Sequence, residues 1–110
     1  MKIFRAARGQ GKTKWLVERI IEHEAEGKDM YYIGSNTSYE RVVCLYQSTM
    51  HKRCPLINMA DKTPHWNAAD ECFFTDNLMD NLRAVASFAP MIREYGCSWY
   101  ITMDKEDFVD

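Results

Sequence analysis

Residues 6–13 combine glycines, a lysine and a hydroxyl side chain at a spacing that suits the binding of phosphate. They read Ala-Ala-Arg-Gly-Gln-Gly-Lys-Thr. Gly9 and Gly11 allow the backbone to turn its N–H groups onto phosphate oxygens, and a following helix would present its positive end to the same anion. Lys12 would supply a positive charge to the β- and γ-phosphates, and Thr13 a hydroxyl ligand for Mg²⁺. The segment predicts a site for a nucleoside triphosphate with magnesium.

The neighbours of these residues extend the candidate nucleotide-binding set. Arg8 lies inside the loop, where its guanidinium could contact a phosphate or the nucleobase, or remain a solvated surface charge. The residues that we predict to contact the nucleotide are Arg8, Gly9, Gln10, Gly11, Lys12, Thr13 and Lys14. Ala6 stands at a position where glycine is commoner. The alternative is a glycine-rich turn that only joins a strand to a helix, but such a turn would not require Lys12 before Thr13.

An acid at the end of a later apolar run is the second feature that suits phosphate chemistry. Residues 72–75 predict a buried strand, and Asp76 follows directly. Phosphoryl-transfer sites hold magnesium through an acid at the end of a strand near the phosphate loop. Thr13 and Asp76 are therefore the predicted metal ligands. The alternative for Asp76 is a cap on the helix that follows.

With these two features the chain resembles the P-loop NTPases. Residues 6–13 match the Walker A loop, and Cys72-Phe73-Phe74-Thr75-Asp76 is similar to a Walker B strand. The Arg-Gly-Gln-Gly-Lys-Thr run looks like loops of the ASCE branch, which includes RecA-like, helicase-like and phage terminase ATPases. The resemblance implies ATP and Mg²⁺ as ligands. Together with the short chain, it suggests a compact phage protein.

The branch resemblance implies two further residues: a glutamate beside the Walker B acid and a polar sensor at the end of the next strand. Thr102 matches the sensor, although it is equally compatible with an ordinary strand end, and Asn77 stands in place of the glutamate. Asn cannot accept a proton at neutral pH, so we predict slow hydrolysis, or a base from Asp80, Asp104 or a partner chain. The predicted catalytic residues are Lys12, Asp76, Asn77 and Thr102.

Two other groups of residues have functional interpretations. Arg83 and Arg93 could act as arginine fingers toward a neighbouring subunit, or remain solvated surface charges. Residues 61–67, which include Trp66, could bind a substrate or partner, or pack Trp66 on the core.

Short apolar runs alternate with helical spacing along the chain, which predicts strands alternating with helices. Strands are expected near residues 3–4, 30–33, 56–59, 72–75 and 99–102, and helices over 12–26, after a cap at Ser38, and over 79–95. Residues 103–110 are expected to be solvated and partly frayed. This order predicts one α/β domain over residues 1–110: a three-layer sandwich with a mostly parallel sheet of four to five strands and the P-loop NTPase fold.

Composition limits the partners. The net charge of −2 gives no general attraction to nucleic acid or anionic membranes. No apolar run has the length of a membrane-spanning helix and no signal peptide is recognisable, so a cytoplasmic location is expected, in the host if the protein is phage-encoded. The four cysteines form no Cys-x-x-Cys pair, which favours reduced, packed thiols over a zinc site.

Three functions are compatible with the sequence. The first is an ATP-binding protein with slow Mg²⁺-dependent hydrolysis; ATP is preferred to GTP because the guanine-reading Asn-Lys-x-Asp pattern is absent. The second is a small nucleoside or nucleotide kinase, although no lid with clustered arginines is visible. The third is a trimmed domain that serves as a non-catalytic interaction module, with a protein partner or a second copy of the chain.

Overall fold

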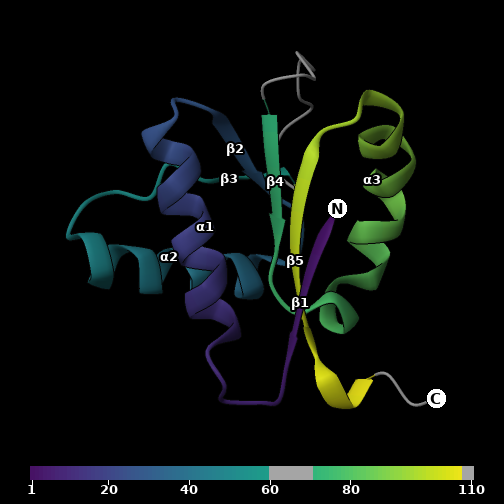
Figure 1. Ribbon diagram of the computed structural model, residues 1–110, viewed down its shortest axis with the longest axis horizontal. Coiled ribbons are helices and arrows are strands. Elements are labelled where there is room, and N and C mark those ends of the chain that lie inside the picture. The colour runs from purple at the N-terminus through teal and green to yellow at the C-terminus, as the bar shows by residue number, and fades with distance from the viewer. Residues whose placement is uncertain (60–70, 108–110) are drawn as a thin grey trace.

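The computed structural model describes residues 1–59 and 71–107, and its centre is one sheet of five strands (Figure 1). In chain order these are β1 (Lys2–Ala6), β2 (Asp29–Tyr32), β3 (Ile57–Asn58), β4 (Glu71–Thr75) and β5 (Ser98–Asp104). Every neighbouring pair is parallel, and the order across the sheet is β1-β5-β4-β2-β3. The expected α/β class and mostly parallel sheet of four to five strands are confirmed.

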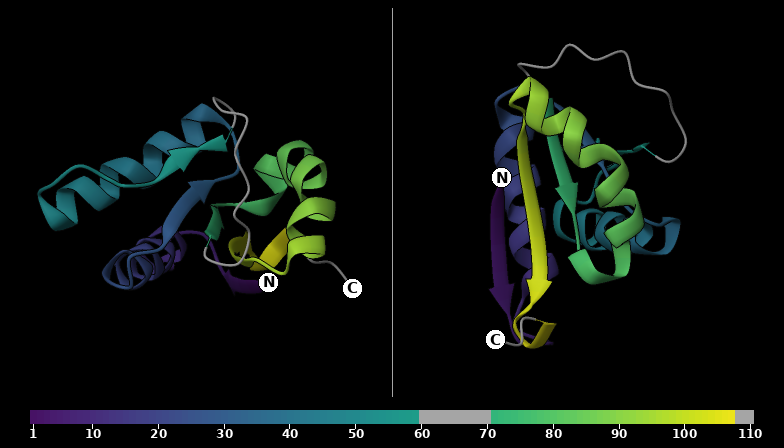
Figure 2. Two further views of the ribbon diagram at one scale, coloured as in Figure 1. Left: turned by 90° about the horizontal axis from the view of Figure 1, so that it is seen from above. Right: turned by 90° about the vertical axis from the view of Figure 1, so that its right-hand side faces the viewer.

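Helices cover both faces of the sheet and make three layers (Figures 1 and 2). The helices are α1 (Lys12–Ala25), α2 (Asn36–Met50) and α3 (Leu82–Tyr95), with short 3₁₀ turns η3 (Leu78–Asn81) and η4 (Lys105–Asp107). One core joins α1 and α2 to one sheet face through Leu16, Val17, Ile20, Val42, Tyr46, Tyr32, Phe74 and Tyr100. A second core joins α3 to the other face through Ile92, Phe73, Trp99 and Ile101. No helix among the described residues is long and apolar enough to cross a membrane.

Alternate residues of β5 face different layers, which places its polar residues on the α1 side. Trp99 and Ile101 belong to the α3 core, whereas Tyr100 belongs to the α1 core. Because side chains alternate along a strand, Thr102 and Asp104 share the face of Tyr100. The β1–β5 register pairs Phe4 with Thr102 and Ala6 with Asp104, so these polar residues lie beside the start of the loop at residues 7–11.

Three expected boundaries differ from the structure. Ser35 rather than Ser38 caps α2: the Ser35 hydroxyl accepts a hydrogen bond from the backbone N–H of Ser38 at 3.2 Å. The helix expected from residue 79 begins as a 3₁₀ turn and becomes α-helical only at Leu82. The expectation that residues 103–110 are solvated is wrong for Met103 and Asp104, which extend β5 and are buried.

Candidate functional site

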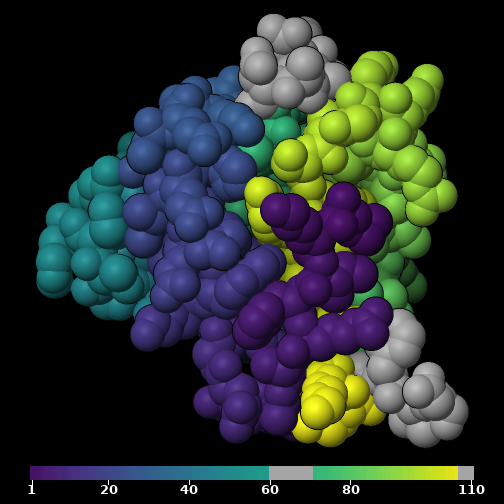
Figure 3. Space-filling model, in the orientation of Figure 1, coloured from purple at the N-terminus to yellow at the C-terminus, as the bar shows by residue number. Residues whose placement is uncertain are grey.

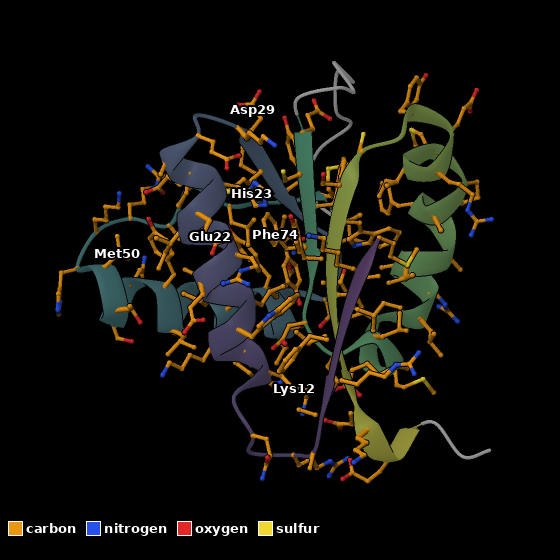
Figure 4. All side chains as sticks on the ribbon, viewed as in Figure 1. Lys12, Glu22, His23, Asp29, Met50 and Phe74 are labelled. Carbon is orange, nitrogen blue, oxygen red and sulfur yellow. The ribbon has the colours of Figure 1, made fainter. Side chains whose placement is uncertain are left out.

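The carboxyl ends of β1, β4 and β5 lie at one edge of the sheet, and a cavity of about 570 Å³ opens there. Its lining residues are Arg8, Gly9, Gly11, Lys12, Thr13, Lys14, Arg41, Leu45, Asp76, Asn77, Asp80 and Asp104. This volume is within the range of small-molecule sites, and the lining is largely polar and charged. Figure 4 shows Lys12 at this edge, far from Asp29 at the other end of the sheet. In the space-filling view, β1 and the loop after it form part of the outer surface (Figure 3).

Left-handed glycines shape the loop between β1 and α1. Gly9 has φ 75° and Gly11 has φ 81°, a region that other residues adopt at a cost in strain. Gly11 is the N-cap of α1 and has no side chain with which to cap it. The first N–H groups of a helix have no acceptor within the helix, so those of α1 are open to an anion in the cavity.

Thr13 and Asp76 meet in this cavity although they are far apart in the sequence. The Thr13 hydroxyl donates to Asp76 Oδ2 at 2.8 Å across a separation of 63 residues. On the other side, the Thr102 hydroxyl donates to Asp76 Oδ1 at 2.5 Å. The Asp76 carboxylate therefore bridges the start of α1 and the end of β5. The alternative role of Asp76 as a helix cap is not what the structure displays, because its carboxylate is engaged by these hydroxyls.

The carboxyl group of Asp76 is buried, and the side chains that bond to it are neutral hydroxyls. Its exposure is 3%, and among the described residues its carboxylate makes hydrogen bonds to the two threonine hydroxyls but no ion pair. Burying a carboxylate without compensating charge is costly. The charge and donor set fit Mg²⁺, which prefers oxygen ligands and keeps several waters. The described part of the chain contains no cluster of three or more His, Cys, Asp or Glu side chains suited to a metal.

A network of neutral groups fixes the backbone of Asp76. Its carbonyl accepts hydrogen bonds from Asn81 Nδ2 at 2.7 Å and from the Ser38 hydroxyl at 3.2 Å, and its N–H donates to the Tyr32 hydroxyl at 3.0 Å. Burial raises the pKa of Tyr32 to about 12, so this hydroxyl stays neutral. A Cβ at Gly34 would lie 2.7 Å from Asn81 Oδ1, so glycine is required for the close approach of Asn81.

Lys12 and Arg8 bind a second buried carboxylate. Lys12 Nζ forms an ion pair with Asp104 Oδ1 and lies 3.4 Å from the carbonyl oxygen of Ala7, to which it donates. Arg8 Nε donates to Asp104 Oδ2 at 3.3 Å. The hydrogen bond from Lys12 is the main cause that holds the pKa of Asp104 below its ordinary value, and Arg8 adds to it against the opposing effect of burial.

Asn77 has an unusual backbone conformation beside Asp76. Its φ of 62° is in the left-handed region, which non-glycine residues rarely adopt and which is common at functional sites. Its N–H donates to the Thr102 hydroxyl at 2.8 Å, and its Nδ2 donates to Asp80 Oδ2 at 2.8 Å. Its Oδ1 is buried and accepts no hydrogen bond from the residues that the structure describes. This oxygen can accept a hydrogen bond from a water but cannot take its proton.

The structure separates the predicted site residues into three groups. Most of the loop residues, together with Asp76, Asn77 and Asp80, line the cavity. Thr102 does not line it; it is fully buried and forms hydrogen bonds with the Asp76 carboxylate and the Asn77 N–H. Gln10 is also outside the lining set, and its N–H closes a turn on the carbonyl of Ala7 at 3.2 Å.

The remaining candidates lie elsewhere. Arg83 and Arg93 are on α3 and line two other cavities. The interpretation of residues 61–67 falls outside the described residues. All four cysteines are free, and Cys54, Cys72 and Cys97 are buried.

Two cavity residues were missed by sequence reasoning. Arg41 and Leu45 come from α2 and line the cavity together with the loop residues. They are four positions apart, which places both on one face of the helix. This spacing indicates that Arg41 and Leu45 share a helix face. The sequence alone could not show that this face would contact the cavity.

Comparison of the chain with protein-family models and with curated proteins gives no match. The geometry of the cavity and the residues that line it are therefore the basis for assigning a function.

Proposed function

We propose that this protein binds ATP with Mg²⁺ in the cavity at the carboxyl edge of the sheet and hydrolyses it slowly, as a compact P-loop NTPase. The observation that carries the proposal is the 2.8 Å hydrogen bond between Thr13 and Asp76 in the cavity that Lys12 also lines. Lys12, Thr13 and Asp76, which the sequence separately suggested as contacts of one nucleotide and its Mg²⁺, line the same cavity. A glycine-rich turn with no function would not need that convergence.

The roles of the residues follow from their chemistry. The backbone N–H groups of Gly9 and Gly11 and the start of α1 would bind phosphate oxygens. Lys12 would place its charge on the β- and γ-phosphates, while Thr13 and Asp76 would hold Mg²⁺, Asp76 either directly or through a water. The ion, when bound, neutralises phosphate charge and polarises the P–O bonds. Lys14 and Arg41, which also line the cavity, would add positive charge around the phosphates.

The sheet order supports the resemblance to the ASCE branch. β5 lies between β1, which leads into the loop, and β4, which leads to Asp76. This order puts Thr102 within hydrogen-bond distance of Asp76. Thr102 would orient the carboxylate and the neighbouring Asn77 N–H, which is a positioning role.

Slow hydrolysis is proposed because the groups beside Asp76 do not include a strong, well-placed base. Asn77 can orient a water through Oδ1 but cannot remove its proton. Asp80 is hydrogen-bonded to Asn77, with its Oδ2 2.8 Å from Asn77 Nδ2, and it is exposed to solvent. Asp80 is therefore the candidate proton acceptor within the chain, and a partner chain is the alternative source of one.

A specific observation also favours a kinase as the second candidate. A neighbouring cavity of about 290 Å³ is lined by Gly34, Ser35, Asp80, Asn81, Arg83 and Ala84, so it shares Asp80 with the first cavity. An acceptor molecule bound there would lie next to the γ-phosphate, with Arg83 available for an anionic group. ATP turnover measured with a panel of nucleosides and nucleotides tests this candidate: acceleration by one acceptor supports the kinase, and a uniform basal rate rejects it.

Calorimetric titration with ATP and GTP, in Mg²⁺ and in EDTA, tests the main proposal. We expect saturable, Mg²⁺-dependent binding of ATP, which Lys12→Ala weakens by roughly 100-fold or more because a charge-assisted contact to phosphate is lost. Lys28→Ala is the matched control, because it removes the same charge just beyond the far end of α1. Absence of binding to the wild-type protein would reject the nucleotide site and leave a non-catalytic interaction module, with a protein partner or a second copy, as the better account.

A further inference from the structure

Asp104 forms ion pairs with Arg8, in the loop after β1, and with Lys12, the first residue of α1. A phosphate bound in the cavity would need the same two cations. The Asp104 carboxylate pairs with Lys12 through one oxygen and with Arg8 through the other. The strand register pairs Asp104 with Ala6, which ends β1 immediately before the loop. The backbone of Asp104 is therefore held within the sheet. Arg8, in contrast, lies in the loop after β1, the strand at one edge of the sheet.

The two ion pairs differ in exposure. The side chains of Lys12 and Asp104 are 10% and 4% exposed, whereas that of Arg8 is 87% exposed. A buried pair is little screened by salt, so the contact between Lys12 and Asp104 is the stronger of the two. The contact of Arg8 is at the surface and contributes little.

We propose that Asp104 is an internal competitor of phosphate, which holds Lys12 away from the nucleotide and sets the affinity of the site. The inference rests on the proposed nucleotide site and adds its regulation. In the nucleotide-free protein Lys12 is bound to Asp104. A phosphate must take over the Lys12 ammonium, and the Asp104 carboxylate must then give up that ion pair or share it.

The size of the effect follows from the fraction of molecules in which Lys12 is free. The apparent dissociation constant equals the intrinsic constant divided by the fraction of competent molecules. If Lys12 is free in about a tenth of the molecules, Asp104 weakens nucleotide binding about 10-fold. A variant that removes the Asp104 carboxylate charge should therefore bind the nucleotide about 10-fold more tightly.

Other charges around Asp104 do not replace it in this role. Asp76 and Asp80 line the same cavity, but neither forms an ion pair with Lys12 among the described residues. Lys14 and Arg41 are the other cations of the lining, and neither pairs with Asp104. Glu106 provides a matched comparison: it is an exposed carboxylate in η4, two residues after Asp104 and outside the cavity lining, so its loss removes the same charge nearby without releasing Lys12.

The experiment compares ATP and ADP affinities, measured by calorimetry in Mg²⁺, for the wild type, Asp104→Asn and Glu106→Gln. We expect Asp104→Asn to bind both nucleotides about 10-fold more tightly, and Glu106→Gln to differ from wild type by less than about 3-fold. Asp104→Ala, a second neutral variant, should match Asp104→Asn. Unchanged or weaker binding by folded Asp104 variants, or equal tightening in Glu106→Gln, would overturn the inference while leaving the nucleotide site intact.

A measurement on the wild-type protein avoids dependence on the folding of the variants. The carboxyl-carbon NMR resonance of Asp104 reports its ion pairing, and we expect ATP with Mg²⁺ to shift it as Lys12 transfers to phosphate. A saturating nucleotide that leaves this resonance in place would contradict the competition. Failure of both wild type and Asp104→Asn to bind any nucleotide would instead reject the proposed function, and the inference with it.

Discussion

Asp76 is the residue on which the metal assignment depends, because its hydrogen-bond partners are neutral and its carboxylate is buried. We expect Asp76→Asn to lower ATP affinity in Mg²⁺ by roughly 10-fold or more, toward the value in EDTA, because a charge-assisted interaction with the ion is lost. Affinity in EDTA should stay within about 3-fold of wild type, since there is then no cation for Asp76 to hold. Calorimetry measures both, with Asp29→Asn at the other end of the sheet as the control. Full Mg²⁺ dependence in Asp76→Asn would contradict the assignment.

At the residue scale, the sequence indicated which loop residues would lie together in one cavity, but not which carboxylate would pair with Lys12 and Arg8. Gly9, Gly11, Lys12 and Thr13 could be selected because each type has a distinct use at that spacing. The pairing of Lys12 with Asp104 could not be predicted, because it depends on the β1–β5 register. The sequence indicated Asp104 only as a possible base, whereas its ion pairs with Lys12 and Arg8 lower its pKa and make it a weak proton acceptor.

At the scale of elements, the chain's apolar runs indicated the five strands but not their order. Periodicity shows that a strand exists and which residues are buried, whereas neighbours in a parallel sheet are chosen by long-range packing. The position of β5 between β1 and β4 is therefore a finding of the structure. The same limit explains the error at the end of β5: polar residues there looked solvated, but Asp104 is buried with charged partners.

Helix α3 contains a proline whose removal should stabilise the protein without affecting the site. Pro90 is exposed and inside the helix, where it lacks the N–H that would bond the carbonyl of Ala86. We expect Pro90→Ala to raise the free energy of unfolding by about 1–2 kcal/mol, after an offset for the more flexible unfolded chain. Urea unfolding measures the change. The exposed Ser87→Ala in the same helix should give less than about 0.5 kcal/mol.

A lower stability in Pro90→Ala would mean that the proline favours the folded state through the geometry of α3. ATP affinity is the second readout for this variant. It should be unchanged, because α3 packs on the sheet face opposite α1 and lies outside the lining of the cavity.

Across the whole molecule, ion-paired carboxylates should make stability fall in acid. The hydrogen bond from Lys12 holds the pKa of Asp104 below its ordinary value. The pKa of Glu24 is also lowered: burial acts to raise it, but hydrogen bonds from Lys52 and Tyr46 outweigh that effect. A depressed pKa in the folded state gives stability that is present above the unfolded value, about 4, and is lost as the pH falls through the folded value.

We therefore expect the free energy of unfolding to decrease as the pH is lowered from about 5 to about 3. Asp104→Asn and Glu24→Gln should each flatten part of this slope, and only the former should change ATP affinity. Urea unfolding across this pH range provides the measurement. An unaltered slope in both variants would show that other groups control acid stability.

The most direct test of the central claim is to locate the metal of a bound nucleotide. Mn²⁺ in place of Mg²⁺, added with ATP, broadens the NMR signals of nearby amides. The account predicts that broadening is strongest around Thr13 and Asp76, extends to Lys12 and Thr102, and requires ATP. Broadening centred elsewhere in the described chain, or none with saturating ATP, would contradict a nucleotide–magnesium site at the carboxyl edge of the sheet.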